Sequence, residues 1–234
     1  MRNARRVAVG LLVLITCTTI PALAQADTCT NIVDQALVVT GANCAAVGRN
    51  EVCYGNVQLV AEPQADVTDF VFAAPGDVAA LEAVRTLNLS SRLEDSEEWG
   101  IALMRVQADV PDALPGENIT LVLFGEVEVE NAAEAEANPM QAFFFETGLR
   151  GTQCTEVPDS GILVQTPDGY DEISFTANDV DIRLGSTAFL QGEADAEMIV
   201  SVVEGQAAVT AQGVTVVVPA GSRTRIALES DRRT

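Results

Sequence analysis

The segment MIVSVVEGQAAVTAQGVTVVVPAG, residues 198–221, alternates apolar residues with small or polar ones between turn signals. An alternation with a period of two places every second side chain on the same face, which is the pattern of a half-buried β-strand. The pairs Glu204-Gly205 and Gln212-Gly213 interrupt the alternation, and Pro219-Ala220-Gly221 interrupts it again. We therefore predict a series of hairpins, with strands over residues 198–203, 207–211, 214–218 and 223–228.

The same alternation predicts which side chains of this region face inward. Val200 and Val202 share one face, and a return of the chain at Glu204-Gly205 would bring Val209 opposite them. Gly205 is expected to adopt a positive φ, where a β-branched residue would be strained by about 1–2 kcal/mol. The predicted inward set comprises Phe189, Val200, Val202, Val209, Val216 and Ile226.

Strand-like runs between turn signals also occur upstream. They cover residues 34–40, 57–61, 101–110, 119–129 and 140–147. Residues 78–87 fit a helix or a strand, and the alternation of residues 86–90 favours a strand near the end. From Val157 the turn signals become regular again. The chain is therefore predicted to be all-β, either an antiparallel β-sandwich or a double-stranded β-helix-like hairpin stack.

The N-terminus has the three regions of a secretory signal peptide over residues 1–26. Arg2, Arg5 and Arg6 form a positive region, and an apolar stretch follows over residues 7–15. That stretch is shorter than the roughly 20 apolar residues that span a bilayer. Two overlapping Ala-x-Ala sites follow, and we predict cleavage after Ala26.

One alternative interpretation of this segment is a lipoprotein signal. Cys17 lies near the end of the apolar stretch, where a lipid-modified cysteine would be placed, but Thr16 before it fits such a signal poorly. We therefore favour an unlipidated chain that begins at Asp27. No stable membrane insertion is expected after cleavage, because the later apolar runs are too short to span a bilayer.

The length of the exported chain bounds its organisation. About 208 of the 234 residues remain after cleavage, enough for one or two packed β domains. We expect an N-terminal disulfide-containing β domain over residues 27–156 and a second β domain over residues 157–228. Residues 229–234 are expected to form a polar tail.

The charge is strongly acidic. The chain has 34 Asp and Glu against 13 basic residues, all of which are Arg. Removal of the signal peptide takes away three Arg and no acid, so the exported chain has a formal net charge of −24. Such a surface repels nucleic acid and anionic lipid headgroups, so neither is expected as a partner. Solubility explains this charge better than a divalent-cation site does.

Four cysteines remain after cleavage, and their even number in an exported chain predicts disulfides. Three connectivities are possible. We favour Cys44 with Cys53, because the turn Gly48-Arg49-Asn50 lies between them, and Cys29 with Cys154. A four-cysteine zinc site is disfavoured, since its ligands usually come as two close pairs.

Residues 182–189 (IRLGSTAF), 200–209 (VSVVEGQAAV) and 218–222 (VPAGS) resemble the FecR-like periplasmic β domain of ferric-citrate-type regulators. The resemblance covers about 50 residues and implies an extracytoplasmic sensing or protein-interaction module. The chain departs from the regulator pattern in having no membrane span after the signal and no cytoplasmic arm. The upstream part, including Cys53-Tyr54-Gly55-Asn56 and the run from Trp99 to Met104, resembles uncharacterised exported bacterial proteins.

The residue inventory weighs against an enzyme. The chain has no His, which excludes the usual Ser-His-Asp and Cys-His arrangements and the usual metal ligands of cupins. It also has no Lys, which excludes Ser-Lys and Schiff-base chemistry. A carboxylate-dependent glycosidase stays as the less favoured alternative. The sole Trp, Trp99, is expected in the core rather than at a sugar-binding site.

Two acidic clusters could supply oxygen ligands for calcium. They are Asp168 with Asp171 and Glu172, and Asn178 with Asp179 and Asp181. Neither has the spacing of an EF-hand loop, so we interpret both as turn and solvated-strand residues. The run Phe143-Phe144-Phe145 places apolar rings on both faces of a strand, with the core as the default and an interface as the second choice.

The sequence therefore predicts an exported, non-enzymatic binding or structural module of the bacterial cell envelope or extracellular space. Its partner would be an unknown protein or an envelope polymer. The alternative is an extracytoplasmic sensor or regulatory component that acts through a membrane partner, as the FecR-like resemblance implies. No catalytic, cofactor-binding or metal-binding residue is assigned, and no cofactor is expected.

Overall fold

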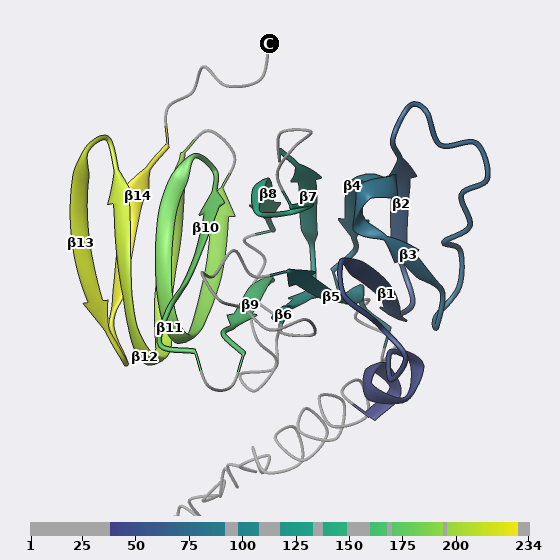
Figure 1. Cartoon of the computed structure of the whole chain (residues 1–234), viewed down its shortest axis with the longest axis horizontal. Coiled ribbons are helices and arrows are strands. Elements are labelled where there is room, and N and C mark those ends of the chain that lie inside the picture. The colour runs from purple at the N-terminus through teal and green to yellow at the C-terminus, as the bar shows by residue number, and fades with distance from the viewer. Residues whose placement is uncertain are drawn as a thin grey trace, which may run out of the picture.

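The computed structural model describes residues 38–91, 98–107, 118–132, 138–148, 160–167, 170–193 and 196–228. The fourteen strands in these residues belong to one curled sheet (Figure 1), which confirms the all-β prediction. Neighbouring strands are antiparallel except β8 and β10, which pair in parallel, so the sheet is mixed rather than wholly antiparallel.

The strands are bounded as follows: β1 Glu51–Asn56, β2 Leu59–Pro63, β3 Val78–Ala80, β4 Val84–Leu89, β5 Ile101–Gln107, β6 Asn118–Phe124, β7 Val127–Asn131, β8 Ala142–Thr147, β9 Gly161–Gln165, β10 Ile173–Ala177, β11 Val180–Glu193, β12 Glu197–Ala211, β13 Val214–Pro219 and β14 Arg223–Ala227. A 3₁₀ helix, η1, covers Leu81–Ala83 between β3 and β4. The predicted strand near the end of residues 78–87 is therefore β4.

The sheet has two arms that meet at the long strands β11 and β12. One arm runs in the order β2-β4-β7-β8-β10-β11, and the other runs in the order β3-β1-β5-β6-β9-β11. The first half of β11 pairs with β10, and its second half pairs with β9. One continuous hydrophobic core contains buried side chains from both arms, from Val52 in β1 to Val218 in β13. The curl of the sheet therefore creates the core.

The predicted hairpin at Glu204-Gly205 is wrong, because both residues lie inside the continuous strand β12. Strand β11 accompanies β12 along its length, with a bulge where the register shifts between Thr187 and Ala188. Gly205 does have the expected positive φ, +70°. A Cβ on Gly205 would lie 1.8 Å from the carbonyl oxygen of Gly185, so the bulge requires glycine on steric grounds as well. The pair Glu204-Gly205, with a positive φ at Gly205, is compatible with a bulge or with a hairpin turn. Only pairing with β11 distinguishes the two.

The last strands follow the bend of β12. β14 pairs with the first part of β12 and β13 pairs with its second part. The connection between them hydrogen-bonds to the bulge, where the Gly221 amide donates to the Val202 carbonyl over 2.8 Å. The Ala220 amide donates to the Gly205 carbonyl over 3.0 Å. The predicted turn at Gln212-Gly213 is present, with φ of +49° and +77°.

The predicted inward set is right for Val200, Val202 and Val209, which are buried. Ile226 is partly buried against the same core. The predicted inward position of Phe189 is wrong, because the inward positions of β11 alternate without a break from Ile182 and Leu184 to Ala188 and Leu190. The Phe189 ring stacks on Phe124 with a centroid distance of 5.5 Å. Val216 has the predicted face but not the predicted burial, as described below.

The N-terminal part departs from the predicted strand over residues 34–40. Of that range the structure describes residues 38–40, and they belong to a helix over residues 38–43. Thr40 in the helix and Cys44 directly after it are buried four residues apart, and the Cys44 N–H donates to the Thr40 carbonyl over 2.9 Å. The β-branched run Val38-Val39-Thr40 favours a strand locally, but burial of Thr40 and Cys44 stabilises the helix.

A disulfide joins Cys44, beside this helix, to Cys53 in β1, with the Cα atoms 5.6 Å apart. This is the favoured pairing of these two cysteines. Cys29 and Cys154, which are predicted to pair with each other, lie outside the described residues, as do the predicted signal peptide with Cys17 and the predicted polar tail. The disulfide indicates an oxidising, extracytoplasmic compartment.

The predicted domain boundary at residue 156 lies outside the described residues, and the sheet crosses it. β9, which follows the boundary, pairs with β6 and with β11. β8 and β10 also pair across it. Whether residues 27–156 and 157–228 fold separately stays a prediction.

Helices of the described residues include none that is both long enough and apolar enough to cross a bilayer.

Candidate functional site

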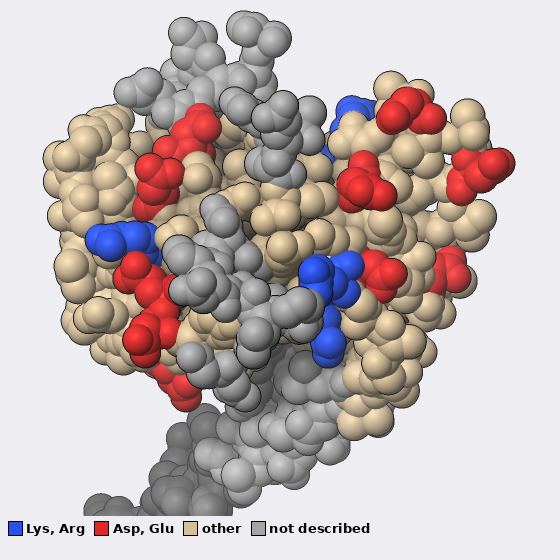
Figure 2. Space-filling view, viewed as in Figure 1, with Lys and Arg blue, Asp and Glu red and all other residues tan. Residues whose placement is uncertain are grey.

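The charged side chains are widely distributed. Figure 2 shows acidic side chains spread over the visible face, whereas the margin over β13, at the left, carries neither acidic nor basic ones. Three ion pairs between described residues are exposed: Glu62 with Arg85, Glu172 with Arg183, and Glu197 with Arg225. Exposed pairs of this kind contribute about 0–1 kcal/mol each, so they do not mark a specialised site.

The first calcium candidate does not gather its ligands. Asp171 and Glu172 are exposed, and Glu172 lies 3.5 Å from the Arg183 guanidinium. Asp168 lies outside the described residues. No group of three or more metal-ligating side chains occurs among the residues that the structure describes.

The second candidate has a structural role. Asn178 and Asp179 form the turn between β10 and β11, with φ of +49° and +57°. The buried Asn178 amide accepts a hydrogen bond from the Phe145 N–H over 2.8 Å and donates one to the Phe145 carbonyl over 3.0 Å. Asp181 accepts a hydrogen bond from the Thr176 hydroxyl over 3.0 Å. These side chains form hydrogen bonds between strands, which agrees with their interpretation as turn and strand residues.

A polar hollow of about 490 Å³ lies over β4, β7 and β8, with Glu126, Glu128 and Glu146 along it. Glu128 and Glu146 occupy directly opposed positions on neighbouring strands. Like charges placed opposite each other weaken a sheet, so the pair does not stabilise the fold. The pair is the nearest feature to the two carboxylates of a glycosidase, but the buried Trp99 is not among the residues that line the hollow.

The aromatic runs belong mainly to the core. Phe143 and Phe145 are buried, and Phe143 stacks on Phe175 with a centroid distance of 6.2 Å. Phe144 is half-buried on the other face of β8. Trp99 is 4% exposed, in agreement with a core position. The predicted interface at this phenylalanine run is therefore limited to one partly covered ring.

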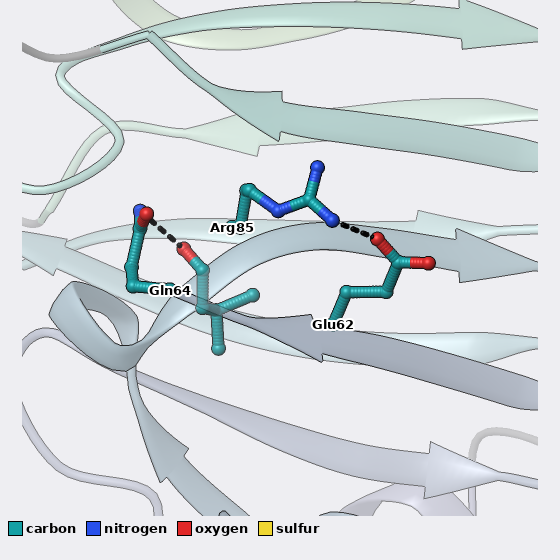
Figure 3. A network of polar contacts seen from close by, with 4 residues as sticks. Glu62, Gln64 and Arg85 are labelled. Atoms are coloured by element: carbon teal, nitrogen blue, oxygen red, sulfur yellow. Dashed lines mark hydrogen bonds and ion pairs between the residues drawn. The ribbon is translucent and has the colours of Figure 1, made fainter. Parts of the chain in front are cut away.

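Among the described residues the sheet has four edge strands, and three of them are charged or short, which hinders pairing with another chain. β2 ends in Pro63 and has the Glu62–Arg85 ion pair beside it (Figure 3). β14 carries two exposed arginines, Arg223 and Arg225. β3 has only three residues.

A half-buried aspartate, Asp77, precedes β3 and holds the turn that leads into it. The Asp77 carboxylate accepts hydrogen bonds from the N–H groups of Ala73 over 2.8 Å and Ala74 over 2.9 Å. These two bonds hold the pKa of Asp77 below its ordinary value, because they favour the charged form. The charged Asp77 side chain therefore stabilises the turn that leads into the short edge strand β3.

The fourth edge, β13, ends in Pro219 as β2 ends in Pro63, but it carries no charged residue and is twice as long as β3. Among the described residues it pairs with β12 alone, so its other side presents backbone groups that no described strand pairs. Val214 is 64% exposed, Val216 is 45% exposed and Val217 is 63% exposed. Thr215 is exposed too, and its hydroxyl bonds to Thr210 on β12. Five β-branched residues in succession, Val214 to Val218, form an uncharged strand that is well suited to pairing.

A hollow of about 230 Å³ opens beside this edge, between β13 and β14. Val214 and Val216 line it from β13, and Thr224 and Ile226 line it from β14. Val216 is opposite Val209 on the inward face of β12, yet it is exposed because β13 is the last strand of its arm. The core is therefore open to solvent at this end, and we call β13 with this hollow the open end.

The sequence analysis did not identify this surface, although one signal for it was present. No charged residue occurs between Glu204 and Arg223, in a chain of which 20% of residues are charged. The alternation of this segment predicts an inward position for Val216, and only the sheet order shows that β13 lies at an edge.

No protein-family model matches the sequence, and no curated protein or solved structure is significantly similar to it.

Proposed function

We propose that the chain is an exported, non-enzymatic docking module that binds a protein by adding a β-strand to β13. The observation that carries the proposal is the contrast among the four edges. β2 and β14 carry charged residues and β3 has only three residues, whereas β13 has no charged residue and is exposed from Val214 to Val217. An edge of this kind is a hazard for aggregation unless another strand covers it.

Strand addition also explains the hollow beside the edge. In this mode of binding, main-chain hydrogen bonds supply affinity and pockets for alternate side chains supply specificity. The hollow lined by Val214, Val216 and Ile226 would receive the side chains of the added strand that point inward. Gln212, Thr224 and Arg225 also line the hollow, so it would accept apolar side chains against the valines and a hydrogen-bond acceptor near Arg225.

The acidic charge supports the same location. A net charge near −24 after signal removal keeps the remaining surface apart from other acidic proteins and from anionic lipid. The open end is free of this repulsion because residues 205–222 carry no charge. The Cys44–Cys53 disulfide supports an extracytoplasmic partner.

Capture of partners from the cell's own envelope tests this proposal. The exported protein would be compared with Val217→Lys, which places a charge on the β13 edge, and with Val60→Lys as the matched control. Val60 is 62% exposed on the hindered edge β2, so both variants add one lysine at a similarly exposed valine.

We expect the proteins captured by wild type to be retained by Val60→Lys and lost with Val217→Lys. A set of captured proteins that is the same for all three would contradict the proposal. Capture of a membrane regulator or of a sigma-factor-binding protein through β13 would favour the sensor role that the FecR-like resemblance implies.

A further inference from the structure

We infer that the strand added to β13 is the β13 strand of a second copy of this chain, so that two open ends join into a dimer. This inference rests on the proposed function and names its partner. It requires an antiparallel pairing about Val216, which would lie opposite its own counterpart.

The sequence of β13 is self-complementary in that register. Val214 would lie opposite Val218 of the other copy, and Thr215 would lie opposite Val217. Each of these pairs joins two β-branched residues on the same face of the sheet, which is a favourable combination. Pro219, which has no N–H to donate, would fall opposite Gly213, so the ladder would end at the same point in both copies.

The ends of the strand leave room for this arrangement. A Cβ on Gly213 would have no heavy atom within 4 Å, and the same holds for Gly221 beyond the other end of β13. The two loops that flank the strand, at Gln212-Gly213 and Pro219-Ala220-Gly221, carry no charge. A second copy can therefore approach the edge without crowding and without a charged loop against it.

Charge also favours a second copy at this surface and nowhere else. Two acidic chains of the same kind repel each other over most of their surface. The charge-free stretch between Glu204 and Arg223 is where that repulsion is smallest. A two-fold pairing of one edge with itself is closed, so it would cover the unhindered edge of both copies and leave none for further growth.

The pairing of Val216 with itself provides a decisive experiment. Val216→Lys would place two lysines directly opposite each other, and Val216→Glu would place two glutamates there. The mass of the exported protein in solution would be measured by analytical ultracentrifugation for wild type, for each variant and for an equimolar mixture of the two variants.

We expect wild type to be a dimer and each variant alone to associate at least about tenfold more weakly, because like charges would meet. The mixture should recover the dimer, since lysine would then face glutamate. A monomeric wild type, a dimer that neither variant weakens, or a mixture that fails to recover would each overturn the inference.

Hydrogen exchange provides a second measurement that needs no variant. The amides of residues 214–218 that point away from β12 should be protected in concentrated wild-type protein and exchange rapidly on dilution. Equal exchange at both concentrations would overturn the inference. A monomeric wild type that still captures envelope proteins through β13 would leave the proposed function standing and remove the second copy as its partner.

Discussion

The two ends of the curled sheet differ in how their edges are treated. At the end that contains β2 and β3, the connection β3-η1-β4 joins one arm directly to the other. There the Gln64 amide donates to the Ala83 carbonyl over 2.9 Å, and its side chain donates to the Val84 carbonyl over 3.3 Å (Figure 3). The Cys44–Cys53 disulfide fixes the neighbouring helix to β1. We call this the closed end.

At the open end the arms are joined only through the long strands, and β13 and β14 end without a covering element. The two ends of the sheet therefore differ in how much each contributes to the stability of the monomer. The closed end uses covalent and hydrogen-bonded links that stabilise the monomer. The open end exposes valines that contribute less to the stability of the monomer and are available for association.

The largest effect on stability is expected at a buried position of β12, the strand that pairs with β13 and β14 at the open end. Val202→Asp would bury an unpaired carboxylate at a position that is 2% exposed, and we expect a loss of more than about 4 kcal/mol or a failure to fold. Ser201→Asp, one residue away on the opposite face, should cost less than about 1 kcal/mol. Urea unfolding of both variants measures this. If Ser201→Asp unfolded the protein and Val202→Asp left its stability unchanged, the inward and outward faces of β12 would be the reverse of those described.

The next effect concerns the bulge that bends β12. Gly205→Ala should lower the free energy of unfolding by about 3–4 kcal/mol, the sum of positive-φ strain and a Cβ crowded by the Gly185 carbonyl. Gly213→Ala is the matched control, because it has a similar φ of +77° and no crowding. It should cost only about 1–2 kcal/mol, as strain alone does. Equal losses in urea unfolding would show that the close approach to Gly185 is not what constrains the bend.

Removal of the disulfide tests whether the ends are independent. Replacement of both Cys44 and Cys53 by Ala should lower the free energy of unfolding by about 2.5 kcal/mol, the chain-entropy value for a loop of this length. Association through β13, measured by ultracentrifugation below the unfolding transition, should not change. If association is lost while the protein stays folded, the closed end influences association at the open end, and the two ends are not independent.

The smallest effect belongs to the turn before β3. The pKa of Asp77 is lowered in the folded protein, so the stability that its charge contributes is present above the unfolded value of 3.8. That contribution is lost as the pH falls from about 3.8 through the lowered folded pKa. Asp77→Asn keeps an acceptor oxygen but removes the charge. The difference in melting temperature between wild type and Asp77→Asn should be small at neutral pH and should vanish in acid; a difference that grows on acidification would contradict the assignment.

The sequence by itself determined the fold class and several local features. Alternation at Val200, Val202 and Val209 predicted buried positions, and the need for a positive φ at Gly205 followed from the turn-like pair Glu204-Gly205. The short spacing between Cys44 and Cys53 favoured the disulfide that the structure contains. These features depend on a few neighbouring residues, whose periodicity and backbone preferences are readable without the rest of the chain.

Only the tertiary structure decided the features that depend on distant partners. Pairing with β11 keeps β12 continuous through Gly205, with a bulge at Val203 in place of the predicted hairpin. The bulge changes the alternation of β12, so that Val200 and Val202 before it and Val209 after it all face inward. Burial of Thr40 and of Cys44, which the disulfide fixes to β1, favours a helix over the β-branched run Val38-Val39-Thr40. The order of strands leaves β13 at an edge, so that Val216 has an inward direction but no layer to cover it. Alternation specifies the face on which a side chain lies, whereas burial requires a second surface, and the long-range pairing of the sheet determines where that surface ends.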